Sequence, residues 1–229
     1  MAFGITTDYF GFADTALGIA ANSASNAGLQ ASEAQAMDSN GDVVASTIHD
    51  TGYGQAVSVD YVCGKASSID FYDTATSKDF RGGKVINGYV ITSISVSTSN
   101  TEQATVTISG QKTIAADSEV SKYDPGFTFT GGKGAQSIGY STDTNTRLTG
   151  SSASFSVQTS RAMDSTNEEL ALDVYGGRLE VTHDLVGVTA APGGTADTGF
   201  TLLTGPGESE SNTEYGTGSA MVFKNISAS

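Results

Sequence analysis

The chain has 229 residues, with 25 Asp or Glu against 11 Lys or Arg, and its formal net charge at pH 7 is -14. Proteins that hold a phosphate backbone depend on clustered Lys and Arg, so these few scattered cations argue against nucleic-acid binding. No long apolar span or basic amphipathic segment is present, so we expect no membrane attachment. The lone cysteine, Cys63, cannot form an internal disulfide, and the first residues lack a secretory signal, so we expect synthesis in a cytoplasm.

The composition predicts a mainly β fold. Tryptophan is absent, proline occurs three times, and Ser, Thr and Gly fill most polar positions. β-Branched Thr suits a pleated sheet and Gly suits turns, while 38% hydrophobic residues are enough to form a core. We expect a β-sandwich or barrel-like core with a long hairpin, one short helix and an N-terminal arm. Residues 41–229 are predicted to form a single β domain.

Residues 1–40 differ in composition from the rest of the chain. They are rich in Ala, Ser and Asn, and their apolar positions recur at a loosely helical spacing. Gly18 and Gly28 lie within this segment, and glycine weakens a helix. We therefore predict an N-terminal arm or a marginal helix here.

Two features resemble parts of metal sites. Asp38–Asp42 carries oxygen ligands at alternate positions, as the start of a calcium loop does, but Val43 and His49 stand where that loop needs Gly and Glu. We predict a turn there, leading into a strand. Both histidines, His49 and His183, precede an aspartate, as in some metal-dependent phosphohydrolases. Those enzymes are helical and need further ligands, so we expect solvated histidines near turns and no metal site.

The clearest alternation of apolar and polar residues lies between residues 89 and 109. Mostly apolar or β-branched residues occupy every second position of 90–98, and apolar residues do so again in 104–108 after a polar turn. We predict a long hairpin. Its first strand, taken from residue 85 to 98, could extend about 45 Å at roughly 3.3 Å per residue.

This hairpin has two interpretations. It could be a central part of a sandwich, or it could complete a sheet or ring with neighbouring copies, because unpaired edges invite other chains. Glu102 is the one charged residue between Lys84 and Lys112, so little charge protects the strands. On the second interpretation, the predicted subunit-interface residues are Val90, Ile91, Thr92, Ile94, Val96, Thr105, Val106 and Ile108.

The second half of the chain adds shorter elements. Residues 111–125 predict a short helix that ends at Pro125. Gly176-Gly177 is predicted to be a two-residue hairpin turn, and Gly/Ser-rich loops are expected near 186–218. Further strands are predicted at 126–130, 153–160, 170–175, 178–185 and 220–226.

No segment predicts a reaction. The chain has no G-x-S-x-G elbow, and a Ser-His-Asp set is recognised by geometry and not by spacing. Cys63 follows Tyr61-Val62 in a probable strand and is interpreted as a small buried hydrophobe. Gly131–Gly134 lacks the spacing of a phosphate loop and is interpreted as a mobile turn. We therefore expect no enzyme, no catalytic residues, no metal and no cofactor.

The order of these features resembles the major tail tube proteins of tailed bacteriophages over roughly residues 40–185. The segments that carry the resemblance are 42–48, 57–62, the hairpin 89–109, 148–157 and 173–181. The resemblance implies a structural virion protein with a β-sandwich or barrel-like core. Such proteins form hexameric rings whose sheets join into an inner β-barrel, and the rings stack into a conduit for genome DNA.

The resemblance also implies the partners: copies of the same chain and other phage structural proteins, in a virion. A negatively charged lumen repels phosphates, so DNA passes without specific binding. Two alternatives remain open. One is a capsid decoration or head–tail connector protein. The other is a carbohydrate-binding β module or β-fold hydrolase, which the absence of Trp disfavours although nine Tyr residues are present.

Overall fold

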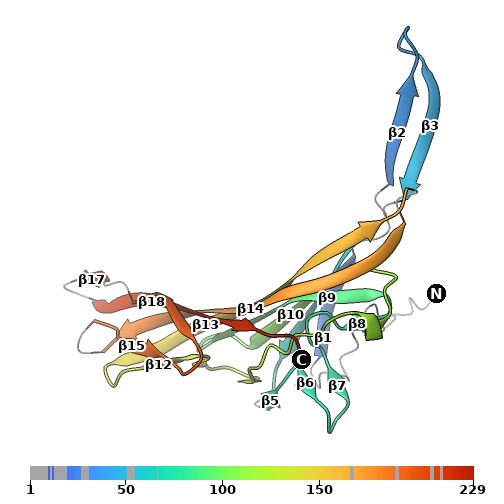
Figure 1. Cartoon of the computed structure of the whole chain (residues 1–229). Coiled ribbons are helices and arrows are strands. Elements are labelled where there is room, and N and C mark those ends of the chain that lie inside the picture. Colours follow the sequence, from blue (N-terminus) through green and yellow to red (C-terminus); the bar gives the residue numbers. More distant parts are fainter. Residues whose placement is uncertain are drawn as a thin grey trace, which may run out of the picture.

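The computed structural model describes Phe10, Phe12 and residues 20–26, 31–50, 55–65, 67–165, 168–188, 191–206, 209–211 and 214–229. Its main element is one large antiparallel sheet (Figure 1). In spatial order the strands are β1 (Ala20–Asn26), β4 (Ala56–Cys63), β10 (Ala104–Lys112), β9 (Tyr89–Ser99), β13 (Thr146–Met163), β14 (Glu169–Gly187), β18 (Glu214–Ile226) and β16 (Thr201–Thr204). Two short strands extend it, β8 (Val85–Ile86) beside β9 and β17 (Ser209–Ser211) beside β18. The predicted mainly β fold is confirmed.

Three short strand pairs lie on one side of this sheet (Figure 1). They are β5 (Ser68–Ile69) with β11 (Phe129–Thr130), β6 (Tyr72–Asp73) with β7 (Lys78–Asp79), and β12 (Tyr140–Thr142) with β15 (Gly194–Ala196). The core lies on this covered side, where burial of apolar surface drives folding. Its largest fully buried aromatic side chains are Tyr61, Tyr140, Phe12, Phe71, Phe129 and Phe155.

The two faces of the large sheet differ because successive side chains of a strand point in opposite directions. On β9, Ile94 and Val96 are buried whereas Ser95 and Ser97 are exposed. The strands on either side of β9 continue this pattern. One face is therefore apolar and packs into the core, and the opposite face carries mainly Ser and Thr.

The hairpin predicted over residues 89–109 is confirmed as β9 and β10, with Ile94 opposite Ile108. Its first strand is shorter than predicted. Asn87 and Gly88 have positive φ angles of 47° and 76°, and they turn the chain back between β8 and β9. The single strand expected from residue 85 onward is thus two strands joined by a tight turn.

The residues of the predicted subunit interface lie on two inner strands of the sheet. β9 and β10 lie between β4 and β13, so neither strand has a free edge. Thr92 is half-buried and Thr105 is exposed. The other predicted interface residues are buried in the core of the chain itself: Val90, Ile91, Ile94, Val96, Val106 and Ile108. The apolar face of the hairpin therefore packs inside one copy.

The marginal helix predicted within residues 1–40 is wrong where the structure describes that segment. β1 pairs with β4, and β2 (Ala31–Met37) pairs with β3 (Val43–Asp50). The loosely helical spacing of apolar residues gave a weak signal, and pairing with neighbouring strands overrides weak local preferences. The predicted boundary between the arm (1–40) and the β domain (41–229) falls in the turn between β2 and β3.

The amino-terminal segment also contributes to the core. Phe12 is fully buried, and its carbonyl oxygen accepts a hydrogen bond of 2.8 Å from the hydroxyl of Tyr61 on β4. Phe10 packs edge-on against the ring of Tyr89 at the start of β9. These two residues attach the segment to the large sheet, and the remainder of the predicted arm before residue 20 lies outside the described residues.

β13 and β14 form the longest hairpin of the molecule. The two-residue turn predicted at Gly176-Gly177, between strands at 170–175 and 178–185, is wrong. Both glycines lie inside β14, where they stand opposite the single residue Val157 and form a bulge. Gly176 has a φ of 66°, a conformation that glycine adopts without strain. Bulges bend a strand, and beyond this one the two strands curve away from the sheet (Figure 1).

The remaining predictions are met in part. A 3-10 turn, Asp117–Glu119, stands where the short helix was expected over 111–125. The strand predicted at 126–130 is reduced to β11, and the loop region 186–218 includes the short strands β15, β16 and β17. The other predicted strands lie within β13, β14 and β18. Among the described residues, no helix is long and apolar enough to cross a membrane.

Candidate assembly surfaces

The hairpin of β2 and β3 stands apart from the large sheet (Figure 1). Its turn is the one predicted at Asp38–Asp42. The Asp38 carboxylate accepts hydrogen bonds from the N–H groups of Asn40 (2.8 Å) and Asp42 (3.0 Å). These bonds hold the pKa of Asp38 below its ordinary value, because they stabilise the charged carboxylate. The predicted turn is therefore confirmed, and its first carboxylate stays charged.

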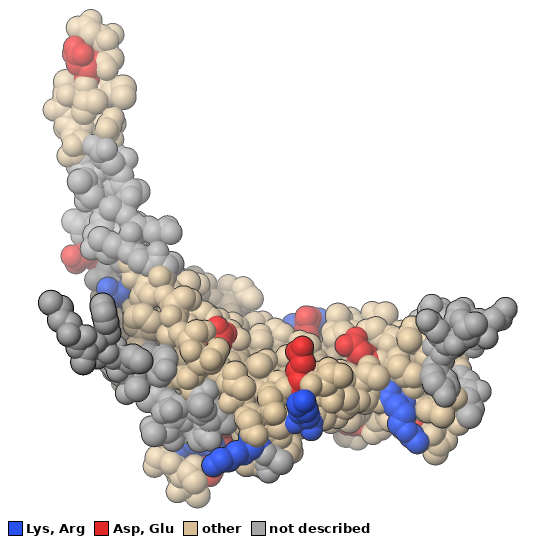
Figure 2. All heavy atoms as spheres, turned by 180° about the vertical axis from the view of Figure 1, so that it is seen from behind, with Lys and Arg blue, Asp and Glu red and all other residues tan. Residues whose placement is uncertain are grey.

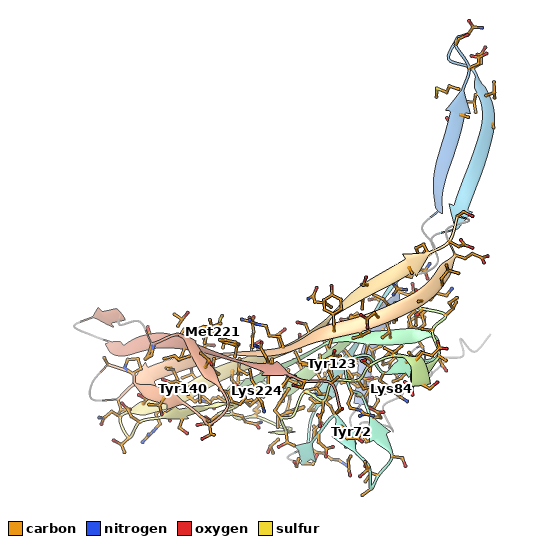
Figure 3. All side chains as sticks on the ribbon, in the orientation of Figure 1. Tyr72, Lys84, Tyr123, Tyr140, Met221 and Lys224 are labelled. Carbon is orange, nitrogen blue, oxygen red and sulfur yellow. The ribbon has the colours of Figure 1, made fainter. Side chains whose placement is uncertain are left out.

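Nothing in the described chain covers the outer part of this hairpin. Residues 35–46 are all exposed, and Figure 3 shows their side chains standing free of the rest of the molecule. The exposed fraction is 61% for Met37, 51% for Val43 and 64% for Val44. An isolated two-stranded hairpin is at best marginally stable in water, and it gains stability by packing against another surface. We refer to residues 37–44 as the hairpin tip.

The curved end of the β13–β14 hairpin is fixed by a buried carboxylate. Glu169, on β14, is fully buried, pairs with Arg161 on β13, and accepts hydrogen bonds from the Thr113 hydroxyl and the Ile114 N–H. Removing either Arg161 or Glu169 would leave the other charge buried without its partner, so the two residues stabilise the fold only as a pair. It ties this end of the hairpin to the segment after β10. Leu170, beside it, is exposed.

The polar face of the large sheet is an ordered array of hydroxyl groups. We call it the hydroxyl face and define it by its exposed members Ser95, Ser97, Thr105, Ser152 and Ser154. The pairing of the strands places these residues side by side across β10, β9 and β13. None of them is charged. The face is thus wide, polar and almost without charge at its centre.

Among the described strands, the large sheet ends at β1 on one side and at β16 on the other. β1 contains only Ala, Asn and Ser, and β16 is Thr-Leu-Leu-Thr with Leu202 and Leu203 exposed. Natural proteins protect edges with charges, proline, bulges or short strands. Neither strand has a charge or a proline, although β16 is short and each strand has one register irregularity. A strand of another copy can extend the sheet beside either of these two end strands.

Of the two histidines considered for chemistry, the structure describes the side chain of His183. His183 is buried in the middle of β14, so the expectation of a solvated histidine near a turn is wrong for this residue. Its Nε2 lies 3.0 Å from the Ile138 carbonyl oxygen, and its ring stacks on Tyr140. His49 is on β3, and its side chain lies outside the described part. No group of three or more His, Cys, Asp or Glu able to hold a metal occurs among the described residues.

Two further expectations concern Cys63 and the glycine-rich segment. Cys63 is buried, as predicted, and burial raises the pKa of its thiol to about 11. In the segment Gly131–Gly134, the N–H groups of Gly131 and Gly132 donate to the carbonyl oxygens of Ser67 and Cys63. These donors are used within the fold, so the segment does not form a phosphate loop.

Burial of His183 predicts a loss of stability in mild acid. Burial lowers its pKa below the ordinary value of 6.5, so the unfolded chain binds a proton at a higher pH than the folded chain. This contribution is present above pH 6.5 and is lost as pH falls toward the folded pKa, at up to about 1.4 kcal/mol per pH unit. Urea unfolding at pH 7.5, 6 and 5 should show the decrease. The variant His183→Gln should flatten it, and an equal slope in both proteins would contradict the assignment.

The described residues thus offer surfaces for association: the hairpin tip, two sheet edges and the hydroxyl face. Figure 2 shows acidic side chains near the hairpin tip, while Lys and Arg lie mainly over the body of the molecule. The sequence signals for these surfaces were the Asp38–Asp42 turn and the Ser/Thr alternation of β9. No protein-family description matches the chain, and no curated protein sequence matches it.

Proposed function

We propose that the chain is a structural subunit, without catalytic activity, that associates with copies of itself into stacked rings enclosing a conduit for genome DNA. This is the arrangement of the phage tail tube proteins that the sequence resembles. The observation that carries the proposal is the hairpin tip, whose apolar side chains Met37, Val43 and Val44 have no cover within the described chain. Exposed apolar residues on a marginally stable element are typical of a contact with another chain.

The sheet edges support association within a ring. When β1 of one copy pairs with the β16 edge of the next, backbone groups at both edges gain hydrogen-bond partners. Repeating this contact around a ring removes every free edge, which is how closed β assemblies avoid uncontrolled pairing. The hairpin tip then remains available for contacts between rings.

The hydroxyl face supports the conduit. Hydroxyl groups bind water and carry no positive charge, so such a face gives phosphates no ion-pair partner. Its flanking charged residues Asp60 and Glu180 are acidic, and Arg178 is paired with Glu180 at 2.7 Å. A lumen lined in this way lets DNA pass without being held. The location in this proposal is the virion, after synthesis in a host cytoplasm, beside other structural proteins.

Replacing the apolar side chains of the tip tests this role. The triple variant Met37→Ser, Val43→Ser and Val44→Ser should fold with an unchanged melting temperature, because all three positions are exposed. It should lose stacking, as measured by sedimentation velocity and negative-stain electron microscopy. Ile114→Ser, another exposed apolar position, is the matched control and should assemble normally. Unchanged stacking of the triple variant would contradict a role for the tip, and a discrete trimer of the unmodified chain would favour a capsid decoration protein.

A further inference from the structure

We propose that the hairpin tip of one copy docks on a cationic end of a second copy, formed by Lys65, Lys133 and Arg147. The inference rests on the proposed self-association and names the surface that receives the tip. The tip offers two carboxylates, Asp38 and Asp42, beside its exposed apolar side chains. The receiving surface must therefore offer positive charge that is not already neutralised within its own chain.

The cationic end and the hairpin lie at opposite ends of the same strands. At the hairpin end, β4 begins a few residues after β3, and the Lys112 N–H at the end of β10 donates to the Gln55 carbonyl oxygen. β4 then runs for eight residues, about 26 Å at roughly 3.3 Å per residue. Lys65 follows the far end of β4. A tip that points away from one end of the sheet cannot reach the other end of the same copy, but it can reach that of a neighbour.

The backbone brings the three cations to one region. The Gly132 N–H donates to the Cys63 carbonyl oxygen, and Lys133 forms a β-bridge with Gln103. Asn100, in the loop between β9 and β10, links the segment that carries Arg147 to this region. Its N–H donates to the Thr149 carbonyl oxygen, and its side-chain amide donates to the Leu148 carbonyl oxygen next to Arg147.

The charges of this end are available for a partner. Lys65, Lys133 and Arg147 are exposed, and none of them takes part in an ion pair with a described residue. Most other cations are paired: Lys78 with Asp70, Arg81 with Asp79, Lys84 and Lys122 with Asp117, Arg161 with Glu169, and Arg178 with Glu180. Of the rest, Lys112 lies at the hairpin end and Lys224 lies over the Phe200 ring.

Apolar surface accompanies the charge on both sides of the contact. Val62, on the exposed face of β4, is 37% exposed and lies close in sequence to Lys65. It can pack against Val43 or Val44 of the docking tip. Glu102, in the loop next to Gln103, is exposed and opposes the acidic tip. Because the contact joins two different surfaces, it repeats from copy to copy and gives the stack a direction.

Removing the tip charges is the first test. The double variant Asp38→Asn and Asp42→Asn keeps a side-chain oxygen to accept the turn hydrogen bonds while removing both charges. At low salt it should raise the protein concentration needed for stacking about tenfold, which corresponds to about 1.4 kcal/mol, because two weak exposed ion pairs are lost. Asp173→Asn, an exposed position on β14, should have no effect. Glu102→Gln should lower the concentration needed.

Exchanging the charges is the decisive test. Asp42→Lys and Lys133→Glu should each fail to stack alone, whereas a 1:1 mixture should co-assemble, because residue 42 of each copy can then face an oppositely charged residue 133 of the other variant. A structural defect in either variant would not be repaired by mixing. Two results would overturn this docking alone. One is a double Asn variant that stacks at the same concentration as the unmodified protein, and the other is a 1:1 mixture of the two charge-exchange variants that fails to assemble. An unmodified protein that never associates would contradict the proposed function itself.

Discussion

Replacing Ile94 with Asp should leave the chain unable to fold. Ile94 is fully buried at the centre of the sheet, paired with Ile108 on β10 and with Phe155 on β13. An unpaired carboxylate at this position costs several kcal/mol, and a domain of this kind has only about 5–15 kcal/mol of total stability. The variant should be insoluble, or soluble without a cooperative thermal transition, as measured by circular dichroism.

The neighbouring residue provides the matched control. Ser95 follows Ile94 on the same strand and belongs to the exposed hydroxyl face. Ser95→Asp introduces the same carboxylate one position along, and it should fold with a melting temperature close to that of the unmodified protein. If Ile94→Asp folds as well as Ser95→Asp does, the register of β9 is different from the one described.

Placing a lysine at each sheet edge should abolish ring closure. The double variant Ser25→Lys and Leu203→Lys adds a positive charge to β1 and to β16, and both positions are exposed. Lysine on an edge strand is a natural device against edge pairing. We expect the variant to keep the melting temperature of the unmodified chain and to sediment as a monomer or as short head-to-tail oligomers.

A lysine at the centre of the sheet distinguishes edge effects from charge effects. Ser154→Lys adds the same charge on the hydroxyl face, away from both edges, and it should still form rings. Closed rings of the edge variant would show that copies join by another surface. Failure of Ser154→Lys to form rings would show that charge, and not edge pairing, governs association.

Sequence alternation was enough to identify the central hairpin. Along β9, Ser and Thr alternate with Ile94 and Val96, and the same alternation occurs along β10. Each strand therefore has one apolar face, and that face is buried. The turn at Asp38–Asp42 was predictable for a local reason, because an Asp side chain at its start can cap the N–H groups that follow. The hairpin and the turn are both determined by residues that are close together in the sequence, so a local pattern predicts them.

Two turns show what local patterns leave open. Asn87-Gly88 is a strong signal for a tight hairpin turn, and the alternation that continues across it obscured the signal. Gly176-Gly177 has a similar composition but forms a bulge. A side chain added to Gly177 would lie 2.7 Å from the Tyr123 ring, so glycine is required there by packing against a distant segment, which the local sequence does not reveal.

The candidate surfaces depend on the order of strands in space. The sequence suggested that residues 89–109 join copies, because their length and low charge resemble an unprotected edge. In the sheet, β4 and β13 flank them, and the outermost described strands are β1 and β16. Strand order is set by pairings between residues far apart in the chain, so alternation along one strand could not locate the edges.

Negative-stain electron microscopy of the purified chain, across a range of protein concentrations, tests whether copies associate into rings. Self-association through the hairpin tip and the sheet edges predicts closed rings with a central channel, and stacks of such rings at higher concentration. Particles that remain monomeric at every concentration, confirmed by sedimentation velocity, would rule out self-association through these surfaces.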